Sequence, residues 1–323
     1  MHDLRQRTFH ALNTAGPFVG LAMVFLLFVA LQGGALPSIA DLRTVAVQSV
    51  IVAILGISMT MVIMSGAIDL SVGSILALSS VVAAMTSRAG WPLPAVVAAS
   101  CLTGTCCGLY NGTLVSLLRL PAFIVTLGTL GFFRGLSKWL ADSRVITAPT
   151  LGLDSFVQPT PTASWMLVAP AVWLAAAIAV ATRLLLQHSV WGRRMTALGS
   201  NELAARFAGI PLNRTRIQVY ALSGFLVGIA GILQFGRLTV GDPTIAIGLE
   251  LDAVAAAVIG GASLSGGRGS VFGAVCGAVM MAYLRNRCTS IGWPNFVQEM
   301  IVGHIILFAV AIDFARRHRT REP

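Results

Sequence analysis

The amino-acid sequence predicts an all-α membrane protein, a polytopic bundle of about ten transmembrane helices with both termini in the cytoplasm. Of its 323 residues, 56% are hydrophobic and only 11% are charged, whereas soluble domains average about 25% charged residues. Apolar runs of about membrane-spanning length follow one another along the chain. At roughly 20 residues per span, these runs fill a single transmembrane domain and leave little chain for a soluble one.

The basic residues predict the orientation of this bundle. The net charge is +10, and five arginines lie within residues 187–216, with Arg119 and Arg268 on the same predicted side. Cytoplasmic loops carry the Lys/Arg excess, so residues 1–15, 187–216 and 313–323 are predicted to be cytoplasmic. This distribution explains the basic balance and argues against nucleic acid as a partner. Six basic residues fall on the outer side and disagree with the rule: Arg134, Lys138, Arg144, Arg237, Arg285 and Arg287.

The first predicted span covers residues 16–31. The basic residues before it are also typical of a cleaved signal peptide, but a protein with many later spans does not need one, and an uncleaved first helix is favoured. The remaining predicted spans are residues 44–64, 68–86, 95–118, 121–140, 165–186, 217–235, 251–264, 271–283 and 296–312.

The fifth of these spans is irregular. It begins apolar, then continues as RGLSKWLADSR, and Gly128, Gly131 and Gly135 interrupt its apolar run. Glycine lowers helix propensity by about 1 kcal/mol relative to alanine. We therefore expect a short or interrupted fifth helix, followed by an external segment over residues 141–162.

Glycines also recur at four-residue spacing, for example at Gly104, Gly108 and Gly112, and at Gly224 and Gly228. This spacing places them on one helical face, where neighbouring backbones can approach closely. Either these helices slide past each other or they pack tightly without moving, and tight packing is the favoured interpretation.

Residues 187–216 form a polar, Arg-rich island between two spans. Within it, residues 202–208 contain helix formers, and Gly209 and Pro211 end them. We expect one short helix lying across the cytoplasmic face, where it offers a contact to another protein.

Polar residues inside the spans are candidates for a solute pathway. Asp69 lies between the second and third apolar runs, and a charge at the bilayer centre costs about 2.5–3.5 kcal/mol on insertion scales. With Ser71 it resembles a helix start, where such side chains accept backbone N–H groups. Asp69 and Ser71 therefore either cap a helix or line the pathway, with the cap favoured. Asn111 and Thr126 either contact a polar solute or bond between helices.

Three stretches together carry a family resemblance. They are GAIDLSVGSILAL (residues 66–78), NGTLVSLLRLPAFIVTLGTLGFFRG (residues 111–135), and residues 197–278, which begin ALGSNELAARFAGIPLNRTR. In this order and spacing they resemble the inner-membrane permease subunits of bacterial ATP-binding-cassette importers for monosaccharides, of the ribose, xylose, arabinose and rhamnose type. More distant relatives carry nucleosides, autoinducer-type furanosides and branched-chain amino acids.

The resemblance implies that the island docks on a separate ATPase. Ala204 and Ala205 followed by Gly209 resemble a degenerate Glu-Ala-Ala…Gly loop, in which Leu203 separates Glu202 from the alanines. The docking role is carried over onto these residues: Gly199, Asn201, Glu202, Ala205, Arg206 and Gly209. The alternative is a topology anchor without a partner.

The implied partners are the ATPase, a periplasmic or lipoprotein sugar-binding protein, a second permease copy in a homodimer or heterodimer, and the bilayer of the inner membrane. The chain lacks a GxxxxGK[ST] loop, so ATP is expected to be used by the partner and no cofactor to be bound here. The five cysteines lack paired CxxC spacing, and no catalytic or metal constellation is recognised. The rival class is an ion-coupled secondary transporter, for which Asp69 and His304 are the only candidate relays.

Overall fold

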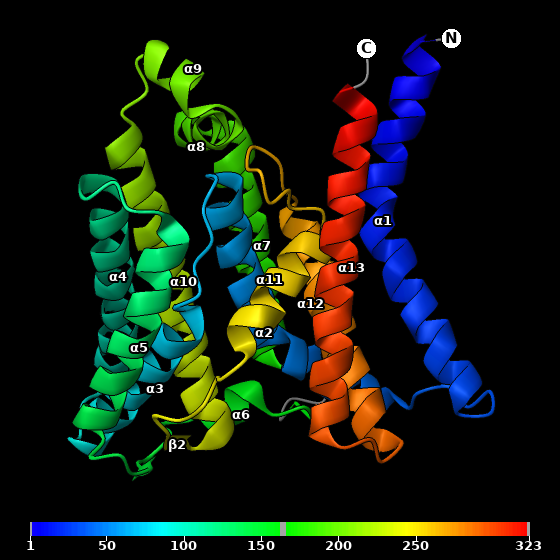
Figure 1. Ribbon diagram of the computed structural model, residues 1–323. Helices are drawn as coiled ribbons and strands as arrows, with labels where there is room; N and C mark the ends of the chain where they lie inside the picture. Colours follow the sequence, from blue (N-terminus) through cyan, green and yellow to red (C-terminus); the bar gives the residue numbers. More distant parts are fainter. Residues whose placement is uncertain (1, 162–165, 322–323) are drawn as a thin grey trace.

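The computed structural model describes residues 2–161 and 166–321, and this part of the chain is almost entirely helical (Figure 1). The predicted all-α class is confirmed. Each of the ten predicted spans overlaps one helix, and three shorter helices (α6, α8 and α9) lie in the connections. The elements are α1 (His2–Leu31), α2 (Ile39–Met64), α3 (Val72–Arg88), α4 (Leu93–Leu117), α5 (Ala122–Leu140), β1 (Ile146–Thr147), α6 (Leu153–Val157), α7 (Pro170–His188), α8 (Val190–Ser200), α9 (Glu202–Phe207), α10 (Leu212–Leu238), β2 (Val240–Gly241), α11 (Leu249–Ile259), α12 (Val271–Ser290) and α13 (Asn295–Arg321).

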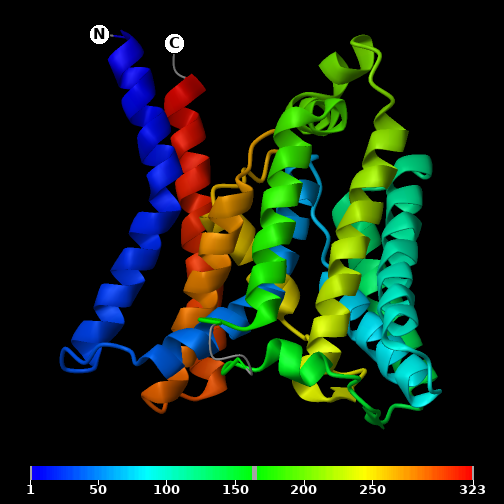
Figure 2. The same cartoon turned by 180° about the vertical axis from the view of Figure 1, so that it is seen from behind.

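Within residues 2–161 and 166–321, four helices are long and apolar enough to cross a membrane, namely α2, α4, α7 and α10. Shorter apolar helical stretches cover Gly16–Leu31 of α1, all of α3, and Asn295–Phe308 of α13. These helices stand roughly side by side in both views (Figures 1 and 2). The architecture is therefore a helical membrane bundle.

The bundle has two distinct ends. At one end lie α8 and α9, together with the beginning of α1 and the end of α13; at the other lie α6 and the short β1–β2 pair (Figures 1 and 2). In this pair, Ile146 faces Gly241 and Thr147 faces Val240 in antiparallel register. The beginning of α1 and the end of α13 thus lie at the same end of the bundle as the Arg-rich island.

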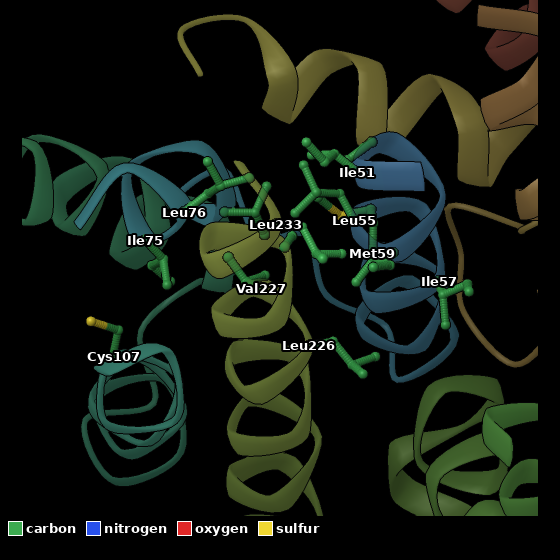
Figure 3. Packing of buried hydrophobic residues seen from close by; sticks show 14 of the residues in the cluster. Ile51, Leu55, Ile57, Met59, Ile75, Leu76, Cys107, Leu226, Val227 and Leu233 are labelled. Atoms are coloured by element: carbon green, nitrogen blue, oxygen red, sulfur yellow. The ribbon is translucent and has the colours of Figure 1, made fainter. Parts of the chain in front are cut away.

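Helix α2 lies at the centre of the bundle, and 94% of its most apolar window is buried. Figure 3 shows Ile51, Leu55 and Met59 of α2 directed toward Leu76 of α3 and Leu233 of α10. Lipid tails are as apolar as these side chains, so removal from water cannot drive this packing within a bilayer. Close van der Waals contact between helices is what holds the centre together.

Glycines bring α4 and α10 into backbone contact. A Cβ atom added at Gly104 would lie 2.2 Å from the carbonyl oxygen of Gly224, and one added at Gly108 would lie 2.1 Å from that of Tyr220. Any side chain at these positions would force the two helices apart. The observed contact agrees with the tight-packing interpretation of the four-residue glycine spacing.

The predicted interruption of the fifth helix is wrong, because α5 runs without a break from Ala122 to Leu140. A Cβ atom added at Gly128, Gly131 or Gly135 would meet nothing within 4 Å. Glycine weakens a helix without removing a backbone hydrogen bond, whereas sharp breaks need proline or an inserted group. The non-helical backbone inside the bundle lies instead at residues 65–71, and α3 begins at Val72.

Polar partners explain three of the outer arginines that disagree with the positive-inside rule. Arg285 pairs with Asp252 at 2.9 Å, and Arg287 pairs with Asp41 at 3.1 Å. Arg134 donates to backbone carbonyls, as described below. These cations are therefore neutralised or hydrogen-bonded within the protein, and their position on the outer side does not contradict the orientation.

Candidate functional site

Two short helices, rather than the single one predicted, form the Arg-rich island. Ser189 caps α8 by accepting a hydrogen bond from the Gly192 N–H at 2.9 Å. Asn201 caps α9 by accepting from the Ala204 N–H at 3.0 Å. Gly209 follows α9 with φ of +75°, a left-handed conformation that favours glycine and turns the chain toward α10. The local sequence therefore builds a compact helical corner at this end of the bundle.

Helix α9 presents an apolar pair to the outside. Of its six residues only Ala205 is buried, whereas the side chain of Leu203 is 67% exposed and that of Phe207 is 88% exposed. Residues four apart lie on the same face of a helix. Exposed apolar surface surrounded by polar residues marks a site of protein contact.

Sequence reasoning missed Leu203 and Phe207 because it selected the polar and small residues that match the family loop. An apolar pair at i, i+4 in an otherwise polar island was the signal available. Of the predicted residues, Glu202 forms an ion pair with Arg216 of α10 at 3.0 Å, and Arg206 is exposed on α9. The pair links α9 to the first turns of α10.

Gly199 lies in a different environment from the other predicted docking residues. A Cβ atom added there would lie 1.9 Å from the Met64 carbonyl oxygen and 2.9 Å from the backbone nitrogen of Gly267. The Gly267 N–H itself donates to the Met64 carbonyl at 2.9 Å. The end of α8, the end of α2 and the α11–α12 connection therefore meet backbone to backbone. We call Gly199, Met64 and Gly267 the glycine junction.

Residues 65–71 lead from the glycine junction into the bundle and reach Asp69. The Oδ1 atom of Asp69 accepts hydrogen bonds from the Ser71 N–H at 2.9 Å and the Ser71 hydroxyl at 2.6 Å. Asn111 of α4 donates to the Ser71 hydroxyl oxygen at 2.8 Å. The hydroxyl of Thr126 of α5 lies 3.2 Å from the Ile68 carbonyl oxygen and 3.0 Å from the Ala122 carbonyl oxygen of its own helix, so these two acceptors share its one proton.

The structure thus brings together the four residues selected as pathway or cap candidates. Asp69 is 1% exposed, and Ser71, Asn111 and Thr126 are fully buried. The favoured interpretation as a helix cap is wrong, because Ser71, the N-cap residue of α3, makes no side-chain cap hydrogen bond and Asp69 accepts from Ser71 rather than from the first turn of α3. Asn111 and Thr126 link this segment to α4 and α5. In this conformation the cluster organises non-helical backbone, which is tolerated inside a membrane bundle only where protein or water surrounds it.

A second non-helical segment, residues 242–248, enters the bundle from the opposite end and meets the first turn of α3. A Cβ atom added at Gly73 of α3 would lie 2.6 Å from the Ala246 carbonyl oxygen and 2.5 Å from a carboxylate oxygen of Glu250. The other carboxylate oxygen of Glu250 accepts from the Gly248 N–H at 3.1 Å. The starts of α3 and α11 are consequently in contact inside the bundle.

The two candidate ion relays lie in unlike settings. Asp69 is hydrogen-bonded to Ser71 and its neighbours as described, whereas His304 is exposed on α13 and its Nδ1 atom lies 2.8 Å from the Met300 carbonyl.

Comparison with known proteins identifies the class. Residues 42–310 match the family described as branched-chain amino acid transport system / permease component. The ribose import permease protein of Escherichia coli is 36% identical over 286 residues, covering 85% of this chain and 86% of the relative. The ribose import permease protein of Bacillus subtilis is 36% identical, covering 92% of each. The xylose transport system permease protein of Escherichia coli is 34% identical, covering 96% and 97%. No solved structure gives a significant match.

The family match spans most of the chain, and the relatives are aligned over nearly their whole length. The chain therefore belongs to this permease-component family, as a multi-pass membrane subunit of an ATP-binding-cassette importer whose ATPase is a separate chain.

Proposed function

We propose that this chain forms part of the route by which a monosaccharide crosses the bacterial inner membrane. Two relatives that act on different pentoses, ribose and xylose, are similar to it at nearly the same identity. Their common substrate chemistry is a small neutral polyol. The family description favours a second candidate, a branched-chain amino acid, and nucleosides and autoinducer-type furanosides remain further alternatives from the sequence.

The ATPase docks, in this proposal, on α8 and α9. The observation that carries the proposal is the exposed pair of Leu203 and Phe207 at the tip of the bundle. In this proposal, the two exposed apolar side chains fill a groove on the ATPase. Around it, Asn201 and Gly209 fix the ends of α9, buried Ala205 anchors it, and exposed Arg206 and Glu202 give polar contacts at the rim.

Movement of α9 reaches the interior through the glycine junction. The backbones of Gly199 and Met64 pack so closely that not even a Cβ atom fits between them. A displaced α8 therefore displaces the end of α2 and the segment that carries Asp69 and Ser71, and with it the start of α3. Coupling of this sort needs two arrangements of one element that both sites bias, and residues 65–71 supply that element.

A complete importer in this proposal contains two permease copies, identical or closely related, two ATPase subunits on the α8–α9 ends, and a periplasmic or lipoprotein binding protein at the opposite ends. ATP is consumed by the ATPase, and this chain binds no nucleotide. Substrate selection falls mainly to the binding protein.

Reconstitution of the permease with its cognate ATPase and binding protein in proteoliposomes tests the proposal. We expect ATP-dependent uptake of radiolabelled D-ribose or D-xylose, none with a non-hydrolysable ATP analogue, and no competition by leucine or adenosine. Uptake driven by a proton gradient without ATP would overturn the importer mechanism, and uptake of leucine in place of the pentoses would select the second candidate.

A further inference from the structure

Helix α1 diverges from α13 toward its end at Leu31 and packs against α12 (Figures 1 and 2). The Cys276 thiol of α12 donates to the Pro17 carbonyl at 3.3 Å. The ring of Phe25 stacks on that of Tyr283, with centroids 5.5 Å apart. Between α1 on one side and α2, α7 and α12 on the other lies a groove of about 630 Å³. We call it the α1 groove.

The α1 groove is apolar and open to its side. Among its lining residues, only Ser49 and Tyr283 carry polar groups, and the Ser49 hydroxyl donates to the Ala46 carbonyl of its own helix at 2.8 Å. Phe18 and Leu26 of α1 line the groove and are 55% and 63% exposed. Sites for polar ligands need several convergent polar groups. This lining therefore fits a hydrocarbon chain that enters from the surrounding membrane.

The length of the groove matches one leaflet of a bilayer. Its lining residues on α2 run from Leu42 to Ala53, which is about 16 Å at a rise of 1.5 Å per residue. The hydrocarbon core of a bilayer is about 30 Å thick, so one leaflet accounts for about 15 Å. Helix α2 begins at the end of the bundle opposite α8 and α9 (Figure 1). The groove therefore spans one leaflet, the outer one in the orientation predicted from the sequence.

Arg43 stands at the mouth of the groove. It lies on the same face of α2 as Ala46 and Val50, three and seven residues further on, and both of these line the groove. Its Nε atom donates to the Leu167 carbonyl, just before α7, at 2.8 Å. Within the described residues, its two Nη atoms have no hydrogen-bond or ion-pair partner. The half-buried guanidinium thus bridges two walls of the groove and keeps donors for a ligand.

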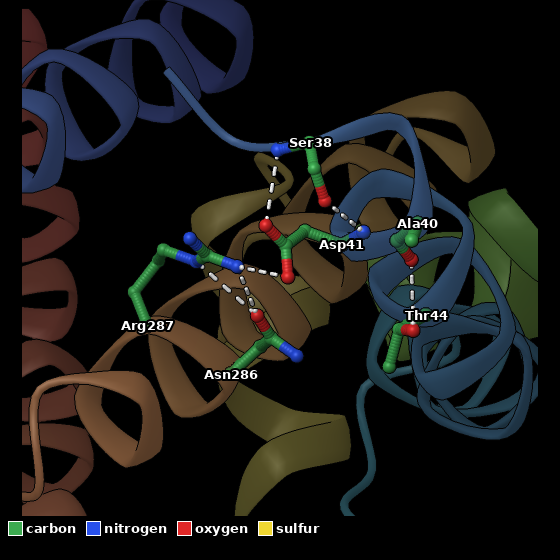
Figure 4. Close-up of polar contacts among 6 residues, drawn as sticks. All are labelled: Ser38, Ala40, Asp41, Thr44, Asn286 and Arg287. Carbon is green, nitrogen blue, oxygen red and sulfur yellow. Dashed lines mark hydrogen bonds and ion pairs between the residues drawn. The ribbon is translucent and has the colours of Figure 1, made fainter. Parts of the chain in front are cut away.

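The acidic residue nearest to Arg43 in the sequence, Asp41, is engaged elsewhere (Figure 4). One of its carboxylate oxygens accepts from the Ser38 N–H at 3.0 Å, and the other pairs with Arg287 at 3.1 Å. Arg43 therefore keeps an uncompensated positive charge at the depth where lipid headgroups lie. A guanidinium with free donors matches the geometry of a phosphate group.

We propose that the α1 groove holds one acyl chain of an outer-leaflet glycerophospholipid, whose phosphate binds Arg43. The rival cation is Arg183 of α7, which lies 4.8 Å over the ring of Phe272. It is about 10 Å beyond Ala176, the last lining residue of α7. A phosphate bound there would leave the outer part of the groove unfilled, so Arg43 is the residue that fits the headgroup.

Native mass spectrometry of the full-length chain released from detergent tests this proposal. The probes are palmitoyl-oleoyl phosphatidylglycerol, the corresponding phosphatidylethanolamine, and the corresponding diacylglycerol, which has the same chains but no phosphate. We expect one retained molecule of either phospholipid and much weaker retention of the diacylglycerol. Arg43→Gln should raise the Kd of both phospholipids about tenfold, the loss typical of one charged hydrogen bond, and leave the diacylglycerol unaffected.

A second variant tests the groove itself. Ala176→Phe fills it from an exposed position on α7 and should weaken binding of all three lipids. The matched controls are Ala177→Phe, at an exposed position beside the groove, and Arg88→Gln, which removes an exposed arginine at the end of α3. Both should bind as the unaltered chain does. Arg43→Lys keeps the charge, so it tests the headgroup site with a smaller loss even where Arg43→Gln fails to fold.

Equal phospholipid binding by Arg43→Gln and the unaltered chain would overturn the headgroup site, as would diacylglycerol binding as tight as that of the phospholipids. Unchanged binding in Ala176→Phe would overturn the groove as the place of the acyl chain. Loss of binding in Arg183→Gln but not in Arg43→Gln would assign the lipid to the opposite leaflet. A change of oligomeric state in Ala176→Phe with lipid binding intact would assign the groove to a second copy of the chain.

Discussion

The two non-helical segments inside the bundle, residues 65–71 and residues 242–248, are both held by α5 but by different chemistry. The neutral hydroxyl of Thr126 shares its one proton between the Ile68 carbonyl of the first segment, at 3.2 Å, and the Ala122 carbonyl of its own helix, at 3.0 Å. Arg134 donates charged hydrogen bonds to two carbonyls of the second, at 2.9 and 2.5 Å. The two side chains are eight residues apart, about 12 Å along the helix. Helix α5 therefore fixes both segments relative to each other.

The difference indicates which segment moves. A neutral hydrogen bond contributes about 1 kcal/mol, and a charged one about 1.5–3 kcal/mol. The first segment is therefore less firmly held by α5, and it is also the one that contacts α8 at Gly199. The second is tied to α5 by Arg134 and leads into α11. We expect the ATPase to shift residues 65–71 while residues 242–248 stay in place.

The largest effect is expected from Gly199→Ala, which breaks the contact between the first segment and α8. The added Cβ would lie 1.9 Å from the Met64 carbonyl oxygen. Backbone on both sides cannot yield as a flexible side chain does, so the cost reaches or exceeds the roughly 3 kcal/mol upper end of usual overpacking. Thermal unfolding of the purified chain measures this loss of stability, and ATP-driven uptake measures its effect on transport. Gly303→Ala is the control, because a Cβ there meets nothing within 4 Å; equal stability of the two variants would contradict the junction.

The next largest effect is expected from Arg134→Gln, which releases the second segment. Loss of charged hydrogen bonds to Pro243 and Ile245 leaves buried carbonyls unsatisfied, at a cost of about 2–3 kcal/mol. Lys138→Gln, one turn further along α5 on an exposed side chain, removes the same charge without those bonds and should leave the unfolding temperature unchanged. If both variants unfold at the same temperature as the unaltered chain, α5 does not hold this segment.

Apolar composition and basic loops were sufficient to predict the bundle, its ten main helices and their order, because a membrane imposes length and hydrophobicity on every span. The same rules misread two features of α5. Its glycines were interpreted as a break, although glycine lowers helix propensity without breaking the helix. Arg134 was counted as a residue in outer water, whereas it satisfies the carbonyls of Pro243 and Ile245 inside the protein.

Individual site residues were predictable, but their contacts were not. Asp69 and Ser71 form a local pattern that is typical of a helix start. Asn111 and Thr126 stand out as polar residues within apolar runs. That all four meet depends on tertiary packing between α3, α4 and α5. The same holds for Gly199, whose close approach to Met64 comes from a part of the chain far away in sequence and has no local signal.

A smaller effect is expected from Thr126→Val, which sharpens the comparison at the first segment. The substitution keeps the shape of the side chain but removes the hydroxyl whose proton the Ile68 carbonyl, at 3.2 Å, shares with the Ala122 carbonyl, at 3.0 Å. Loss of one neutral hydrogen bond costs about 1 kcal/mol, less than the loss at Arg134. A double-mutant cycle of Thr126→Val with Arg134→Gln should show additive losses of stability, because the two segments are held separately. Strongly non-additive losses of stability would indicate instead that residues 65–71 and 242–248 form a single structural element.

The smallest effect on stability, and the most informative on function, is expected from Phe207→Ala. With 88% of this side chain exposed, truncation should change the free energy of unfolding by less than about 0.5 kcal/mol. The ATPase should nevertheless bind far less tightly, since an exposed aromatic anchor is a typical hot spot of an interface.

Hydrogen exchange on the complex of the permease with its ATPase then tests which of the two segments moves. Addition of the ATPase should change the protection of residues 65–71 but not of residues 242–248, and Phe207→Ala should abolish that change. Equal changes in both segments would mean that α5 moves as a rigid body and carries the two together.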